Sequence, residues 1–107
     1  NMSVVESILE QLGYNFEKAY DGSAALKKIK QAAYDIVFMD IEMPVMNGID
    51  ATRIAMTKYR NLNIIALSFH GDFDNISKML SAGARNYMVK DEMDMETLEK
   101  VLYSDLK

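Results

Sequence analysis

IVFMDIEMPVMNG, at residues 36–48, is the stretch of this 107-residue sequence that decides the fold. Its first four residues are apolar, are mostly strand formers, and lead directly into Asp40. A continuous apolar run predicts a strand buried on both faces, which is typical of a parallel sheet covered by helices. Pro44 prevents an early helix and Gly48 permits a positive φ, so we expect the chain to turn sharply beside the Asp40 carboxylate.

Strand-like runs and helical stripes alternate along the rest of the chain. Such alternation with short connections predicts one α/β domain over residues 1–107, with a doubly wound parallel sheet. Upstream of residue 36, we expect a helix over 4–12 ended by Gly13, a half-exposed strand over 15–20, and a helix over 25–33. Downstream, we expect helices over 49–59, around 76–80 and over 98–106, and strands over 64–67 and 87–89.

Composition narrows the classes of function. Cysteine is absent, which excludes disulfides, thiolate metal sites and cysteine nucleophiles. The net charge of -4 argues against nucleic-acid binding by this domain. No apolar stretch is long enough to span a bilayer and no signal peptide is visible, so we expect a cytoplasmic protein that does not bind membranes.

Three polar residues close three of the predicted strands: Asp40, Ser68 and Lys90. Each alone would simply mark where a strand leaves the core. In a doubly wound sheet, however, the carboxyl ends of the strands share one rim, where ligands bind. A carboxylate, a hydroxyl and an ammonium group on that rim are the nucleophile, hydrogen-bond donor and cation needed to hold a phosphoryl group on an aspartate.

These segments resemble a known family. The stretch 36–48, together with Ala66-Leu67-Ser68, Ala82-Gly83-Ala84 and Tyr87-Met88-Val89-Lys90, is similar to the receiver domains of bacterial two-component response regulators, which also occur in hybrid sensor kinases. The spacings agree, and the resemblance covers essentially the whole chain. It implies a flavodoxin-like fold of the receiver (αβ)5 type.

The resemblance also implies roles for single residues. Asp40 would take a phosphoryl group from a phosphohistidine, and Lys90 would pair with a phosphoryl oxygen. Ser68 would move to hydrogen-bond that group, and Tyr87 would change rotamer with it, altering the face made by the fourth helix and the last strand. The side chains of Glu42 and His70 occupy positions that tune the lifetime of the phosphorylated state.

The implied cofactor is Mg²⁺, with Asp40 and the backbone carbonyl of Glu42 as ligands. In the family, an acidic pair after the first strand supplies the other carboxylates. The implied partners are a sensor histidine kinase or a phosphotransfer protein. Two modes of homodimerisation are considered, one through the face of the fourth helix and last strand and one by strand complementation.

The sequence departs from the family at its beginning, because the first strand of about 5 to 6 residues and its acidic pair are missing. That strand is central in the family's sheet, so its neighbours would be left unpaired. Three explanations are open. The sequence is part of a longer chain, another molecule supplies the strand, or the remaining strands close up in a new register. We expect this chain to bind Mg²⁺ weakly.

Two smaller departures lie beside the site. Asp91 replaces the proline that usually follows the lysine, and Phe69 replaces a commonly small residue. We expect Phe69 either to narrow access to Asp40 or to slow the loss of the phosphoryl group. Two other functions are weighed against phosphorylation. One is a pseudo-receiver that works only by protein contact. The other is a hydrolase of the haloacid dehalogenase type, which is disfavoured because it would need an aspartate where Glu42 stands.

Overall fold

The computed structural model describes residues 2–17, 19–43 and 46–105. Pro44 and Leu106, which carried part of the sequence patterns, lie outside the described residues. Helices and strands alternate from β1 onward, as the sequence predicted. The elements in order are α1 (Met2–Gln11), α2 (Gly22–Gln31), β1 (Val37–Asp40), α3 (Gly48–Lys58), β2 (Ile64–Ser68), α4 (Phe73–Ala82), β3 (Asn86–Val89), the short 3-10 helix η1 (Lys90–Glu92) and α5 (Met95–Asp105).

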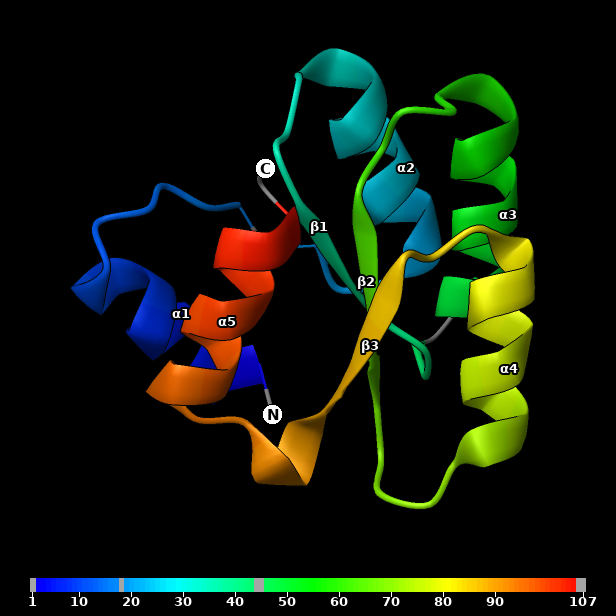
Figure 1. The fold of residues 1–107 in the computed structure, drawn as a ribbon. Helices are drawn as coiled ribbons and strands as arrows, with labels where there is room; N and C mark the ends of the chain where they lie inside the picture. Colours follow the sequence, from blue (N-terminus) through cyan, green and yellow to red (C-terminus); the bar gives the residue numbers. More distant parts are fainter. Residues whose placement is uncertain (1, 18, 44–45, 106–107) are drawn as a thin grey trace.

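The strands form a parallel sheet in the order β1-β2-β3. All five residues of β2 are buried, which confirms that its continuous apolar run belongs to a strand covered on both faces. Alternate β2 side chains enter different cores. Ile65 and Leu67 pack with α1 and α5, while Ile64 and Ala66 pack beneath α2, α3 and α4. Figure 1 shows the two helical layers on opposite sides of the sheet.

Polar caps fix the starts of two helices near the carboxyl ends of the strands. Asp21 accepts a hydrogen bond from the Ala24 amide at 2.8 Å and begins α2, as its turn-like sequence indicated. Asn47 caps α3 in the same way, through the Asp50 amide at 2.9 Å. At the other end of α1, Gly13 has a φ of 82°, which confirms the predicted C-terminal stop.

The strand predicted over 15–20 is wrong for the described residues of that range, none of which is in a strand. Alternating apolar residues suggested a strand, but a strand requires a hydrogen-bonded neighbour, and none of the described strands pairs with this segment. Phe16 instead packs against the core between α1 and α5. Closure in a new register is therefore also wrong here, because this segment does not pair with β1.

Candidate functional site at the carboxyl ends of the strands

The strand register brings the three strand-end residues to one rim. Asp40 lies opposite Leu67 on the neighbouring strand, one residue before Ser68. Ser68 in turn lies opposite Val89, one residue before Lys90. The predicted convergence of Asp40, Ser68 and Lys90 on the carboxyl edge follows directly from this parallel pairing.

Asp40 and Lys90 form the centre of the site. The Lys90 Nζ atom lies 3.0 Å from both carboxylate oxygens of Asp40, so the ammonium group sits astride the carboxylate. The two side chains are only 10% and 19% exposed, for Lys90 and Asp40 respectively. Asp40 Oδ1 also accepts a hydrogen bond from the Glu42 amide at 3.2 Å. The carboxylate is thus held by a cation and a backbone donor while part of it still faces solvent.

Ser68 is buried at the end of β2 with 1% of its surface exposed. Its Oγ atom is buried and has no hydrogen-bond partner among the described residues. A buried hydroxyl without a partner costs about 1–3 kcal/mol. The site therefore contains an unused donor beside the Asp40–Lys90 pair.

The Ser68→Ala variant is expected to raise the free energy of unfolding by about 1 kcal/mol, because it removes this unpaired buried hydroxyl. Urea unfolding followed by circular dichroism measures the change. Ser77→Ala, at an exposed position of α4, is the matched control and should stay within about 0.5 kcal/mol of the parent protein. A destabilised Ser68→Ala would show that the hydroxyl already has a partner.

Phe69 contributes a contact that the sequence did not predict. The Lys90 Nζ atom lies 4.2 Å from the centroid of the Phe69 ring, a cation–π distance. The ring is itself 46% exposed, so it covers the ammonium group from the solvent side. The contact helps to hold Lys90 in place, and the narrowing of access to Asp40 stays a prediction.

The remaining predicted residues, Glu42, Tyr87 and His70, are all exposed. Glu42 is exposed two residues after Asp40, and Tyr87 is 41% exposed on β3. His70 is exposed in the loop after β2, where its Nδ1 atom lies 2.6 Å from Glu92 Oε2. The sequence analysis did not single out Glu92. The only feature that could have pointed to it is its negative charge, two residues after the positively charged Lys90. The contact joins the loop after β2 to the turn after β3.

Gly48 has a different role from the one predicted. It is absent from the glycines with positive φ. It is needed instead because a Cβ atom there would overlap the backbone carbonyl of Asp40. The Gly48 amide donates a hydrogen bond to the Ile41 carbonyl at 2.9 Å, which draws the start of α3 against the end of β1. The loop after Asp40 thus comes back to the end of β1 because the backbone at Gly48 lies directly against the backbone at Asp40.

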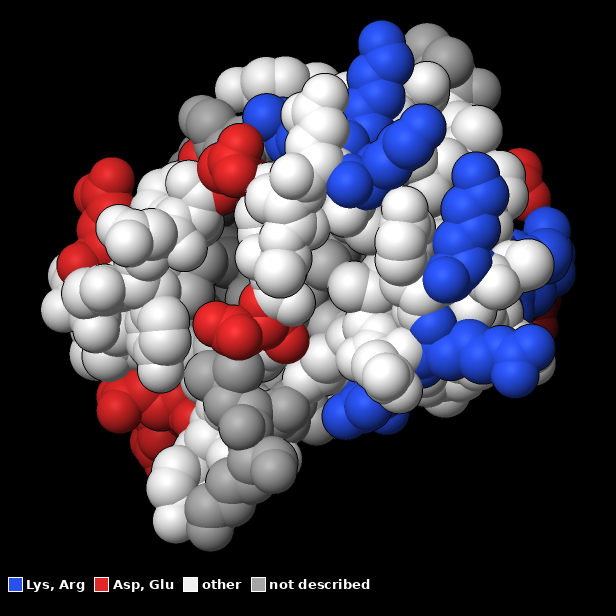
Figure 2. Space-filling model, turned by 90° about the horizontal axis from the view of Figure 1, so that it is seen from above, with Lys and Arg blue, Asp and Glu red and all other residues white. Residues whose placement is uncertain are grey.

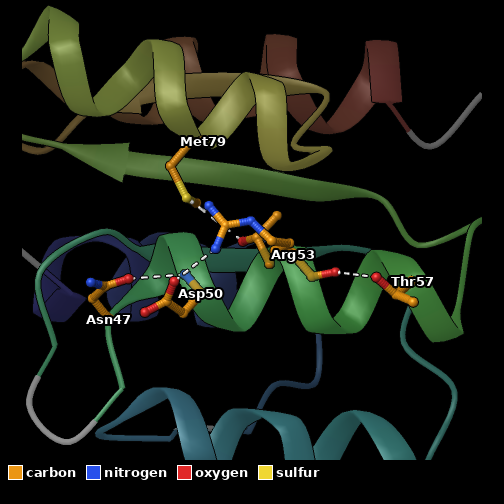
Figure 3. A network of polar contacts seen from close by, with 6 residues as sticks. Asn47, Asp50, Arg53, Thr57 and Met79 are labelled. Atoms are coloured by element: carbon orange, nitrogen blue, oxygen red, sulfur yellow. Dashed lines mark hydrogen bonds and ion pairs between the residues drawn. The ribbon is translucent and has the colours of Figure 1, made fainter.

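Polar contacts run along α3, and one reaches α4 (Figure 3). Arg53 donates a hydrogen bond to Asp50 at 2.9 Å, and the Thr57 hydroxyl donates to the Arg53 carbonyl at 2.8 Å. The buried Thr52 hydroxyl lies 3.7 Å from the Met79 sulfur on α4. The Arg53 and Thr57 contacts are exposed and lie within α3, so they contribute little to stability.

The described residues offer few ligands for a metal. They contain no group of three or more His, Asp or Glu side chains that could hold an ion. Asp40 and the Glu42 carbonyl supply two oxygens, whereas Mg²⁺ takes six in a near-octahedral arrangement and retains several waters. The residues present therefore fit part of a magnesium site, and the other carboxylates expected for the family are not among them.

Comparison with known proteins identifies the family. The family model described as the response regulator receiver domain matches residues 1–103. The chain belongs to this family. This receiver domain is 38% identical to the chemotaxis protein CheY of Thermotoga maritima, over 81% of this chain and 73% of that protein. It is 30% identical to the sensor protein GacS of Pseudomonas syringae pv. syringae, over 95% of this chain and 12% of that protein.

A solved structure confirms the flavodoxin-like fold of the receiver. The receiver domain of the sensor histidine kinase PA1611 from Pseudomonas aeruginosa superimposes with a TM-score of 0.90 at 30% identity, covering 99% of this chain and 88% of that one. That structure has a magnesium ion coordinated in its active site cleft. This receiver spans only 33% of the transcriptional regulatory protein DegU of Brevibacillus brevis, so several relatives carry much more chain.

Proposed function

We propose that this chain is a single receiver domain that accepts a phosphoryl group on Asp40 and acts as a switch in a two-component phosphorelay. The observation that carries the proposal is the Lys90 ammonium group 3.0 Å from both Asp40 oxygens. A cation in this position offsets the repulsion when the carboxylate attacks a second anion. Family membership supports the same function, since receivers are signalling modules rather than classical enzymes.

The reaction joins a nucleophile on the rim, Asp40, to a phosphoryl donor. An Asp40 carboxylate oxygen attacks the phosphorus of a phosphohistidine on a sensor histidine kinase or a phosphotransfer protein. The new O–P bond forms as the P–N bond breaks, and the departing imidazole nitrogen keeps the electron pair and takes a proton from solvent. Lys90 then has a phosphoryl oxygen to pair with as well as the carboxyl group.

The phosphoryl group would also satisfy Ser68. Its buried Oγ has no partner among the described residues, so a phosphoryl oxygen within reach would give the hydroxyl an acceptor. Movement of Ser68 frees space that Tyr87, now 41% exposed, would fill by changing rotamer. The face of α4 and β3 would change with it. Exposed Phe73 and Leu80 on α4 support this face as a surface for homodimerisation or partner binding.

The family implies Mg²⁺ as the cofactor, which would neutralise charge on the transferred group. Asp40 and the Glu42 carbonyl would hold it here, with further carboxylates supplied from beyond the described residues. His70 and Glu42 are the candidates for tuning the lifetime of the phosphorylated state. A cytoplasmic location is part of this proposal. No helix in the described ranges is long and apolar enough to cross a bilayer.

The decisive experiment uses acetyl phosphate and Mg²⁺, with intact mass as the readout. We expect one phosphoryl adduct on a form of the protein that carries the family's first strand and acidic pair ahead of residue 1, and none on its Asp40→Asn variant. An equal adduct on Asp40→Asn would place the modification elsewhere. No adduct on either protein would contradict the phosphorelay function and favour the pseudo-receiver, a module of the same fold that acts by protein contact alone.

The pseudo-receiver remains the second candidate because of one observation. The described residues lack a group of three metal ligands, and phosphorylation in this family depends on the metal. For the 107-residue chain itself, we expect no saturable Mg²⁺ binding up to the millimolar range by isothermal titration. Tight binding would contradict this expectation. It would show that Asp40 and Glu42 suffice, or that a second copy supplies the missing carboxylates.

A further inference from the structure

Basic side chains gather where α2 and α3 end, on a surface here termed the basic face. Its members are all exposed: Lys27 and Lys30 on α2, Lys58 at the end of α3, and Arg60 two residues beyond Lys58. Both helices end at the amino edge of the sheet, because β1 and β2 follow them in the chain. Figure 2 views this edge and shows lysines and arginines over the half of the molecule that holds α2, α3 and α4. The basic face is thus at the opposite end of the sheet from the candidate site.

The two helices that carry the basic face pack against each other. Lys27 and Lys30 are three residues apart in α2, so they project from the same side of that helix. Ile54 and Lys58 are four residues apart in α3 and share a side in the same way. Ile29, which lies between the two α2 lysines in the sequence, is buried in the core. The core therefore takes one side of α2, and the lysines are left on its outer side.

No described carboxylate neutralises the basic face. Residues 22–34 and 51–71 contain its four basic residues and no aspartate or glutamate. None of the four side chains forms an ion pair with a described residue. Two other cations of these helices do have partners, namely Lys28 with Glu17 and Arg53 with Asp50. The positive charges of the basic face are therefore available to another molecule.

The helix ends account for only part of this positive charge. The C-terminal end of an α-helix carries about half an elementary negative charge, which a lysine in the last turn offsets. Lys30 and Lys58 occupy such positions. Two helix ends need about one positive charge between them, whereas the basic face has four basic residues. A surplus of about three positive charges remains, and an anionic partner would complement it.

Exposed apolar side chains lie among these charges. Ile54, on the same side of α3 as Lys58, is 37% exposed, and Tyr59, between Lys58 and Arg60, is 36% exposed. Aromatic and arginine side chains are enriched where proteins bind one another. A phosphate group is held differently, by backbone N–H groups at helix N-termini, and both helices present C-terminal carbonyls here. The basic face therefore fits an acidic polypeptide better than a nucleic acid.

We propose that the basic face binds an acidic segment of a partner protein, in which aspartate and glutamate residues flank an apolar residue. The carboxylates pair with the four basic side chains, and the apolar residue packs against Ile54 and Tyr59. Exposed ion pairs contribute little singly, so binding depends on several pairs and the apolar contact together. Since the basic face lies away from Asp40, the partner stays bound whether or not Asp40 carries a phosphoryl group. This interaction goes beyond phosphoryl acceptance, and its test uses no phosphoryl donor.

The probe is the peptide fluorescein-Asp-Glu-Asp-Leu-Glu-Asp-Glu-amide, added to the 107-residue chain at low ionic strength. We expect saturable binding of one peptide per protein by fluorescence anisotropy. Binding should weaken as salt is added, because salt screens exposed charges. A second peptide has serine in place of leucine and the same charge. It should bind at least about threefold more weakly, because it buries less apolar surface.

Two pairs of protein variants locate the site. Lys58→Glu should weaken peptide binding at least about fivefold, because an attraction becomes a repulsion. Its control, Lys100→Glu on exposed α5 surface, changes the net charge equally and should bind like the parent protein. Ile54→Ser should weaken binding at least about threefold, whereas Leu80→Ser, which removes a similarly exposed apolar side chain from α4, should not. Circular dichroism confirms that all four variants fold.

Several results would overturn the proposal. These are failure of the leucine peptide to bind, equal binding by Lys58→Glu and Lys100→Glu, or equal binding by Ile54→Ser and Leu80→Ser. A fluorescein-labelled oligothymidylate with as many negative charges as the peptide tests the other class of partner. If it binds more tightly than the peptide, the occupant is a nucleic acid. If sedimentation shows a dimer that the peptide dissociates, the occupant is the acidic half of a second copy.

Discussion

Lys90→Ala slows the phosphorylation of Asp40 by acetyl phosphate by roughly 10²–10³-fold, because it removes the cation that stabilises charge on the transferred group. The expectation rests on the position of Lys90 Nζ, at 3.0 Å from each carboxylate oxygen. The measurement is the rate of adduct formation by intact mass, with Mg²⁺ present and with the family's first strand and acidic pair placed ahead of residue 1.

The matched control is Lys100→Ala. Lys100 also pairs with a carboxylate, Glu96 at 3.4 Å, but both side chains are mostly exposed on α5. That variant should phosphorylate at the parent rate, since exposed pairs contribute little. A Lys90→Ala rate within threefold of the control would show that the lysine neutralises no charge during transfer.

Gly48→Ala is expected to lower the free energy of unfolding by roughly 2–4 kcal/mol, within the range of severe single substitutions. The added Cβ atom would overlap the Asp40 backbone carbonyl, and backbone on both sides leaves no flexible atom to yield. Relief of that overlap must move the start of α3 or the end of β1. Phosphoryl acceptance should therefore fall together with stability.

Urea unfolding and the acetyl phosphate assay together test this variant. Ser23→Ala, an exposed position near the start of α2, is the control for adding or removing small groups at a helix start. It should change the free energy of unfolding by at most about 0.5 kcal/mol. A stable Gly48→Ala with normal phosphorylation would show that the loop after Asp40 relaxes without cost.

The sequence predicted the elements that depend on burial. Continuous apolar runs at 36–39, 64–67 and 87–89 identified the strands. The run in β2 is buried throughout, as expected for a strand covered on both faces, whereas β1 and β3 are partly exposed. The polar residues that ended these runs then identified Asp40, Ser68 and Lys90, since parallel strands end at one edge. Both steps use local pattern and one general rule of parallel sheets.

The sequence failed where the outcome depends on partners distant in the chain. Residues 15–20 alternate like a strand, but pairing requires a neighbour that the pattern cannot supply. The contacts of His70 with Glu92 and of Phe69 with Lys90 depend on the paths of two loops, which no periodicity encodes. The sequence indicated that a glycine is needed at position 48 but not why, because close backbone approach and a positive φ both favour glycine.

The parallel register described for β1, β2 and β3 has a consequence for insertions and deletions. Side chains alternate between the two faces of a strand, so losing one residue within β2 would exchange the faces of every residue after it. Ser68 would leave the rim, and the bulky Phe69 would shift toward its place. Single substitutions in β2 are therefore graded in effect, whereas a one-residue deletion would remove the core and the site together. We expect β2 to tolerate the exchange of one apolar residue for another far better than the loss or gain of a residue.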